Sequence, residues 1–382
     1  MNRYLLWFTF FFVFLGTGSS QPYISPYLKQ VLGFSYFKYS SVLAVIYFSM
    51  CIGRIFAPKI LKLVGLKKGI ILGSFSYGIF ALIFVLTGKY VNFILAGIFW
   101  GLGASIFWTA AITLILQMVS SKRYGVENGI LRVFVQAGLI IGFLILGQIL
   151  VKGGYKTLFL SASIFSFAGF LISVFLKETK HFSSSSPTSF SNFVFSKNLL
   201  VFSSGLLVAA LGYGMVLNYI NHYIVENFGE IFLNRTIISF YFSAGLLSFM
   251  GGYLIDKFGE YINCIVFFFL AGVTLIIFSI CPSLSMAIFS LFLLGGLFQI
   301  TPIAATVRVG KIVSEEKRSS AISAVFLWRD FGIGTSILCL GYIKNILSYE
   351  KGFSIVGLLF IFMAFFFLLK KTQDKNKIKG DF

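Results

Sequence analysis

The stretch Gly252-Tyr253-Leu254-Ile255-Asp256-Lys257-Phe258-Gly259 lies between two long apolar runs. A charged stretch bounded by glycines in that position predicts a tight turn at a membrane surface, because glycine lets two helix ends approach closely. A carboxylate in such a turn can cap the N-terminus of a neighbouring helix, where the helix dipole favours negative charge. The stretch therefore indicates membrane-crossing helices that are joined by short charged loops.

The composition supports this class. The chain has 382 residues, of which 58% are hydrophobic and only 11% charged. A water-soluble protein of this length carries more charge, so the sequence indicates a polytopic membrane protein. The net charge of +19 comes from basic residues in short loops between apolar runs. That distribution is typical of loops that face anionic lipid, and it does not indicate nucleic-acid binding.

Twelve apolar runs are long enough to cross a bilayer, which takes about 20 residues per helix. We predict an all-α protein with two six-helix halves, at 1–176 and 198–371, a linker at 177–197 and a short tail at 372–382. The excess of Lys and Arg on one side predicts that both termini are cytoplasmic. The runs are 4–25, 38–58, 69–88, 91–119, 125–151 and 155–176, then 198–225, 233–255, 261–281, 283–309, 319–345 and 352–370.

The two halves repeat in sequence. Residues 15–24 and 211–220 share five of ten residues at an offset of 196, and several glycines recur at an offset of 194. The run 4–25 thus corresponds to 198–225, which predicts a membrane helix there and not a cleaved signal peptide. The repeated glycines are Gly65 with Gly259, Gly101 with Gly295, Gly138 with Gly332 and Gly147 with Gly341.

The run G-x-L-x-D-[KR]-x-G at 252–259, after the eighth apolar run, resembles the loop signature of the major facilitator superfamily of secondary transporters. In the first half Pro58 replaces the first glycine of the motif and Lys62 replaces the aspartate. The resemblance implies that Asp256 docks at the entrance of the fifth helix and acts as a conformational latch. The latch residues that it implies are Gly252, Asp256, Lys257 and Gly259.

The resemblance also implies a substrate cavity near mid-membrane, between the halves, lined by the first, fourth, seventh and tenth helices. Amides, hydroxyls and aromatic rings on those helices suit a sugar-like or amphipathic solute. The candidates are Thr17, Gln21, Trp108, Thr109, Tyr213, Asn218, Gln299 and Thr301.

Ionisable residues inside apolar runs are costly, which makes them candidates for ion coupling. Arg329 and Asp330 lie near the middle of the eleventh run, and Arg132 and Glu127 lie in the fifth. Neighbours on a helix point about 100° apart, so we expect one of Arg329 and Asp330 to face the cavity or the opposite half and the other to be satisfied locally. A coupling pair and a purely structural pair both remain open. Glu127 has cytoplasmic basic residues as alternative partners to Arg132.

The fifth run carries only part of an antiporter-type glycine pattern. Gly138 and Gly142 keep the spacing, but Phe143 occupies the position of the expected proline and Gly147 is one place late. Close helix packing explains these small residues equally well. Export therefore remains one option, beside uptake symport and uniport.

The sequence thus predicts a secondary active transporter of a small solute, and not an enzyme. Neither the four cysteines nor the two histidines have the spacing of a metal site, so we expect no cofactor and energy from a proton gradient through Asp330. The expected partners are a small-molecule substrate and the lipid bilayer, for a monomer in the cell membrane. A non-transporting membrane sensor or assembly protein on the same scaffold is the alternative from another class.

Overall fold

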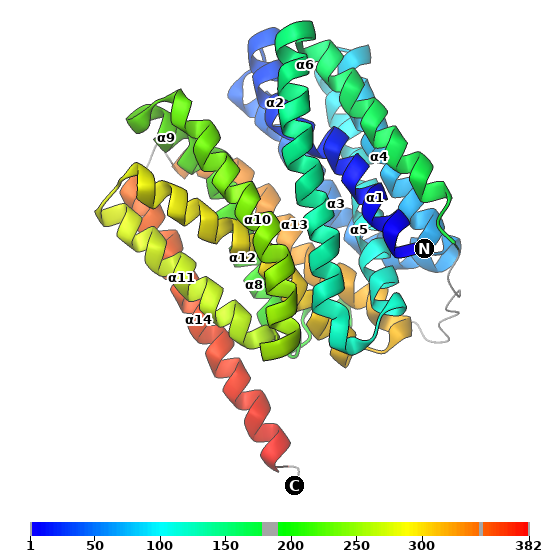
Figure 1. The fold of residues 1–382 in the computed structure, drawn as a ribbon, viewed down its shortest axis with the longest axis vertical. Helices are drawn as coiled ribbons and strands as arrows, with labels where there is room; N and C mark the ends of the chain where they lie inside the picture. Colours follow the sequence, from blue (N-terminus) through cyan, green and yellow to red (C-terminus); the bar gives the residue numbers. More distant parts are fainter. Residues whose placement is uncertain (1, 178–189, 344–346, 381–382) are drawn as a thin grey trace.

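The computed structural model describes residues 2–177, 190–343 and 347–380, and every regular element within them is a helix (Figure 1). Nine of these described helical segments are long and apolar enough to cross a membrane, judged by length and composition. The linker positions 178–189 lie outside the described residues.

The elements of the first half are α-helices with two π-helical segments, η1 and η2, and one 3-10 segment, η3. They are α1 (Asn2–Val13), η1 (Phe14–Gly18), α2 (Ser19–Pro26), η2 (Tyr27–Val31), α3 (Tyr36–Val64), α4 (Leu66–Leu86), α5 (Tyr90–Met118), η3 (Ser121–Arg123) and α6 (Tyr124–Val174). The long α6 turns back at Gly154, whose φ of 74° interrupts the helical geometry. Its two arms correspond to the predicted runs 125–151 and 155–176.

The second half follows the same order. Its elements are α7 (Phe190–Val194), α8 (Leu200–Gly214), η4 (Met215–Ile220), α9 (Asn221–Phe228), α10 (Glu230–Phe258), α11 (Glu260–Ile280), α12 (Leu284–Ile312), η5 (Glu315–Lys317), α13 (Arg318–Ile343) and α14 (Tyr349–Gly380). Helix α14 extends beyond the rest of the bundle in Figure 1. It continues to Gly380, through most of the segment that we expected to be a tail.

Glycine contacts repeat between the halves. The hydrogen atoms of Gly101 on α5 face the Ile46 carbonyl and Ser49 of α3, so closely that a Cβ would overlap them. Gly295 on α12 faces the Phe240 carbonyl and Ser243 of α10 in the same way. Each contact residue is displaced by the same 194 positions as its glycine. The sequence repeat is therefore a repeat of packing.

The halves meet along two helix pairs, α6 with α10 and α3 with α13. Figure 1 shows α6 and α10 side by side. At the end of the bundle where α10 ends and α6 begins, here called the Asp256 end, Gly125 and Gly252 touch backbone to backbone. On the other pair, the Phe48 ring of α3 packs on Gly334 and Phe331 of α13.

Candidate functional site

A fully buried arginine, Arg54, joins α3 to α13 through an ion pair. Helix α3 continues through Pro58 to Val64, so Arg54 lies ten residues before its end, which is roughly 15 Å along the helix axis. We did not predict this residue as part of the site. The apolar run was expected to end at 58, which placed Arg54 near a membrane surface instead of inside.

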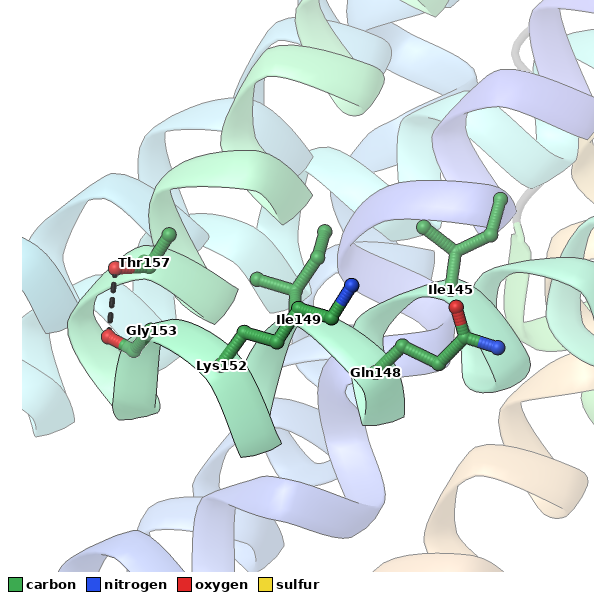
Figure 2. A pocket seen from close by; sticks show the side chains of 6 residues that line it. All are labelled: Ile145, Gln148, Ile149, Lys152, Gly153 and Thr157. Atoms are coloured by element: carbon green, nitrogen blue, oxygen red, sulfur yellow. Dashed lines mark hydrogen bonds between the residues drawn. The ribbon is translucent and has the colours of Figure 1, made fainter.

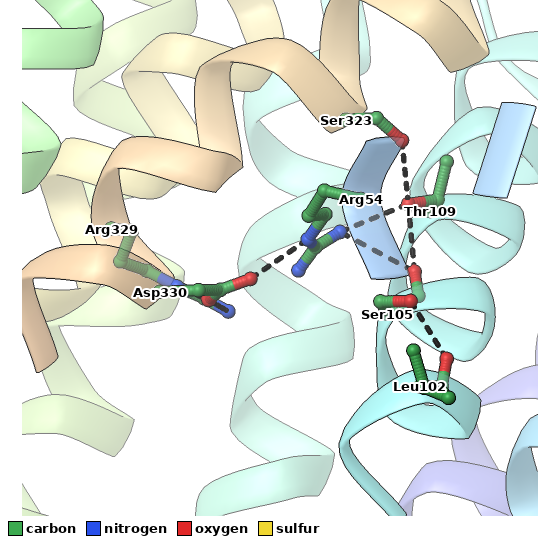
Figure 3. Close-up of polar contacts among 7 residues, drawn as sticks. All are labelled: Arg54, Leu102, Ser105, Thr109, Ser323, Arg329 and Asp330. Carbon is green, nitrogen blue, oxygen red and sulfur yellow. Dashed lines mark hydrogen bonds and ion pairs between the residues drawn. The ribbon is translucent and has the colours of Figure 1, made fainter. Parts of the chain in front are cut away.

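Asp330 joins this arginine to a second one. The Arg54 Nε donates to Asp330 Oδ2 at 2.8 Å, and Arg329 donates from Nε and Nη2 to Oδ1 at 2.9 Å and 2.6 Å (Figure 3). Both Arg54 and Asp330 have no exposed surface, and Arg329 is 7% exposed. Asp330 thus faces the opposite half, whereas Arg329 is satisfied locally by its own neighbour in the chain.

The rest of the Arg54 guanidinium is only partly satisfied. Its Nη1 donates to Thr109 Oγ1 at 2.9 Å, and Thr109 lies 3.1 Å from the Ser323 hydroxyl of the second half. Its Nη2 is buried and has no hydrogen-bond partner among the described residues. In Figure 3 this terminal nitrogen carries no dashed line. A buried charged donor without an acceptor is costly.

A third arginine, Arg132, crosses between the halves nearby. Its Nη1 donates to Gln299 Oε1 at 2.9 Å, and its guanidinium lies 5.6 Å from the Trp108 ring centre. Arg132 and Arg329 are close enough for their charges to repel each other. Trp108, Thr109 and Gln299, which we predicted for the cavity, therefore contact the same cluster of charged residues.

Glu127 does not belong to this cluster. It is buried at the Asp256 end, where it accepts from Arg3 Nη1 at 2.7 Å and lies 3.5 Å from Arg123 Nη2. The structure pairs Glu127 with Arg3 and Arg123, and not with Arg132. The alternative prediction, that Glu127 pairs with basic residues near the entrance of the helix, agrees with these contacts. Arg123 immediately precedes α6, and Arg3 lies in the first turn of α1.

Two other predicted cavity residues meet at one tyrosine. The hydroxyl of Tyr47 on α3 interacts with the side chains of Gln21 from the first half and Tyr213 from the second. Tyr213 also stacks on Phe298, with ring centres 4.3 Å apart. These aromatic groups border the charged cluster, because Tyr47 is within electrostatic range of Arg329 and Asp330.

Two further predicted cavity residues are the threonines Thr17 and Thr301, both fully buried. Thr17 is fully buried inside the first half, where its Oγ1 donates to the Tyr77 carbonyl at 2.7 Å and contacts Ser166. Thr301 is fully buried and donates to the Leu297 carbonyl of its own helix at 2.9 Å. Thr17 therefore faces the interior of the first half, and the hydroxyl of Thr301 satisfies a backbone group of its own helix. The side chain of Asn218 lies outside the described residues.

Asp256 caps the N-terminus of α6, as the resemblance implied it would. Its Oδ1 accepts from the Gly125 N–H and its Oδ2 from the Val126 N–H, both at 2.9 Å. Lys257 is exposed and lies over the rings of Tyr253 and Phe258. The carboxylate connects the two halves because Asp256 lies in the last turn of α10 in one half and caps the N-terminus of α6 in the other.

The remaining glycines of that turn have separate tasks. Gly252 supplies the close backbone contact with Gly125. Gly259 adopts a φ of 89°, which links α10 to α11, and its first-half equivalent Gly65 adopts 85°. A left-handed φ of this kind favours glycine over any side chain with a Cβ.

A surface pocket near Gly154 lies apart from the charged cluster. All its lining residues belong to α6, around the turn between the two arms (Figure 2). Most of them are exposed, and none was predicted to bind substrate. They are Ile145, Gln148, Ile149, Lys152, Gly153 and Thr157. In the described part of the chain, no group of three or more His, Cys, Asp or Glu residues is arranged to hold a metal ion.

Comparison with known proteins agrees with this architecture. The model of the Major Facilitator Superfamily matches residues 6–230 and 202–381. A crystal structure of the E. coli fucose:proton symporter FucP, in a single-residue variant, has a TM-score of 0.75 and 17% identity and covers 96% of this chain and 99% of its own. A FucP structure in the outward conformation has a TM-score of 0.74 and 17% identity, with 96% and 98% covered. None of the curated proteins matches by sequence. The chain therefore belongs to the Major Facilitator Superfamily, and it is a multi-pass membrane transporter and not an enzyme.

Proposed function

We propose that this protein is a proton-coupled secondary transporter of a small polar solute, which works by alternating access between two six-helix halves. The observation that carries the proposal is the fully buried Asp330, held between Arg54 of one half and Arg329 of the other. In a bilayer such charges are rare and generally mark ion or substrate pathways.

The pair between Arg54 and Asp330 links proton binding to movement of the halves. Breaking a buried ion pair while one charge remains costs about 3–5 kcal/mol, so α3 and α13 cannot separate until the carboxylate is neutralised or finds another partner. A proton on Asp330 removes its negative charge and weakens its hold on Arg54. Proton binding and separation of α3 from α13 therefore favour each other.

The Asp256 end is the closed end in this proposal. The contacts of Gly125 with Gly252, of Asp256 with α6, and of the Arg318 Nη1 with the Leu116 carbonyl at 3.0 Å all join the halves there. The basic residues concentrated in loops at that end favour a cytoplasmic location for it and for both termini. The protein is then in an outward-facing state, as a monomer of twelve membrane helices in the cell membrane.

Symport is the coupling mode that we favour. Phe143 occupies the proline position of the antiporter pattern, and Gly142 instead packs against the Leu15 carbonyl and Ser19, which is a packing role. The solved structures of similar fold include a fucose:proton symporter. Uptake of a solute with a proton therefore fits better than the export that the sequence left open.

Reconstituted protein tests the coupling. Neutral monosaccharides, amino acids and dicarboxylates are added separately to proteoliposomes that contain a trapped pH dye, and a transported solute should acidify the lumen. Asp330→Asn should abolish the solute-dependent acidification, because an amide takes up no proton, while Glu316→Gln, at an exposed position, should not change it. Unchanged acidification in Asp330→Asn would refute coupling through this carboxylate.

A further inference from the structure

The buried charges near mid-membrane do not balance. Arg54, Arg132 and Arg329 bring three positive charges and Asp330 brings one negative charge. The other acidic residues that the structure describes lie near helix ends or in η5. Within the described ranges, no other carboxylate lies within ion-pairing distance of these three arginines. The cluster thus retains two uncompensated positive charges.

Two of the arginines also have unused hydrogen-bonding capacity. The Nη2 of Arg54 is fully buried without any partner in the described structure. Arg132 is 5% exposed, and among the described residues its side chain donates to one neutral amide oxygen, on Gln299. Arginine presents a planar fork of N–H donors that matches carboxylate and phosphate groups. Unused donors of this type, next to uncompensated charge, favour the binding of an oxyanion.

Aromatic groups border the same site. Trp108 lies under the Arg132 guanidinium, and the Phe326 ring lies 5.4 Å from the Arg54 guanidinium carbon and 5.0 Å from that of Arg329. Tyr47 and Tyr213 approach from the side of Gln21. Rings around a cationic centre suit an organic molecule better than a hydrated inorganic ion, because they offer apolar contact and no further charge.

We propose that the transported solute is a small organic anion, whose carboxylate or phosphate group binds among Arg132, Arg329 and the Nη2 of Arg54. The inference rests on the proposed function and specifies its substrate class. The bound anion neutralises part of the excess charge and satisfies the donors that the protein leaves open. It also gives Arg54 a second acceptor, so that Asp330 can take up a proton without leaving this arginine unpaired.

Binding is measured on purified full-length protein in detergent, by the ligand-dependent shift of its unfolding temperature. The probes are sodium succinate and sodium glycerol 3-phosphate, with succinamide and glycerol as uncharged counterparts and sodium chloride at equal ionic strength. At least one organic anion should raise the unfolding temperature, and its uncharged counterpart and chloride should not. The two anions also distinguish a carboxylate site from a phosphate site.

Variants assign the binding to the cluster. Arg132→Gln should weaken binding of the effective anion by about 10- to 100-fold, the usual effect of losing a hydrogen bond to a charged group. Arg132→Lys should retain part of the affinity, and Arg123→Gln, at the exposed start of α6, should retain all of it. Binding should also weaken as the pH falls and the acidic group of the ligand becomes protonated. A purely structural role of Arg132 does not predict this pH dependence.

The possible failures are distinguishable. Stabilisation by succinamide or glycerol as strong as by the anions, or equal stabilisation by chloride, would overturn the organic-anion site. Unchanged affinity in Arg132→Gln, with the protein folded as judged by its unfolding temperature, would also overturn it. An anion that binds but never acidifies proteoliposomes would instead contradict proton-coupled transport and leave the binding site standing.

Discussion

The two contacts between the halves, α6 with α10 and α3 with α13, are equivalent by the internal repeat but carry opposite chemistry. At the repeat offset of 194, Gln136 of the first half corresponds to Asp330 of the second, and Arg54 of the first half corresponds to Ser248 of the second. The mid-depth contact is therefore a buried ion pair on the α3–α13 side. On the α6–α10 side the equivalent position holds the amide of Gln136, whose Oε1 has no hydrogen-bond partner within the described residues.

At the Asp256 end the asymmetry is reversed. Asp256 caps α6 with two hydrogen bonds of 2.9 Å, but its first-half equivalent is Lys62, which has no carboxylate to offer the start of α13. Arg318 instead connects that region, through the Leu116 and Gly310 carbonyls. One contact is thus fixed by charge at the Asp256 end and the other by a buried ion pair farther along the helices. This teaches that a symmetric scaffold can place the carboxylates that join its halves at different depths on its two equivalent contacts.

The largest expected effect comes from removing the shared carboxylate of the α3–α13 contact. Asp330→Leu leaves Arg54 and Arg329 buried without a counterion, which should lower the free energy of unfolding by about 3–5 kcal/mol. The double variant Arg54→Leu with Asp330→Leu should recover part of this loss, because one unpaired charge is gone. Unfolding in mixed micelles measures both.

The matched control for that comparison is Glu316→Leu, which removes an exposed carboxylate before α13 and should change stability by about 0.5 kcal/mol or less. A double variant that is less stable than Asp330→Leu would show that Arg54 does not depend on this carboxylate. Charge pairing would then not be what distinguishes the α3–α13 contact from the α6–α10 contact.

A smaller effect is expected from the α6–α10 contact at the Asp256 end. Asp256→Asn retains one acceptor but removes the negative charge from the N-terminus of α6, a loss of about 1 kcal/mol. The population open at this end should then rise by about 5-fold. A reporter, Thr113→Cys, placed one turn beyond Thr109 on α5, should react faster with a water-soluble maleimide in a background that lacks Cys51, Cys264, Cys281 and Cys339.

Lys257→Gln is the control for the latch, since Lys257 is exposed and contacts only rings of its own turn. It should leave the labelling rate of the reporter unchanged. If Asp256→Asn and Lys257→Gln label alike, the stretch 252–259 is only a tight turn, and the contrast between Asp256 and Lys62 has no conformational meaning.

The sequence was sufficient for the all-helical class and for the repeat, because these depend on run length and on recurring glycines, whereas the docking position of Asp256 came from the family resemblance. It was insufficient for Arg54, because the apolar run was predicted to end at 58 and α3 instead continues to Val64. It also misplaced Thr17. The π-helical turn η1 that contains Thr17 changes the residues per turn, so a regular helical period cannot predict which way this hydroxyl faces.

The smallest effect should come from the neutral member of the repeated pair. Gln136→Leu removes a buried amide whose Oε1 makes no hydrogen bond in the described structure. Replacing an unsatisfied polar group by an apolar one of similar size is nearly neutral or stabilising. We therefore expect a change in unfolding free energy of about 0.5 kcal/mol or less, and unchanged solute-dependent acidification, in the assays used for the Asp330 variants.

Gln136→Leu thus tests whether the asymmetry is functional. Asp330 and Gln136 occupy equivalent positions on equivalent helices, so any effect common to both variants reports on helix packing at that depth. Only an effect confined to Asp330 reports on its charge. Loss of transport in Gln136→Leu as severe as in Asp330→Asn would mean that mid-depth polarity on both contacts is required, and that the ion pair is not the element that distinguishes them.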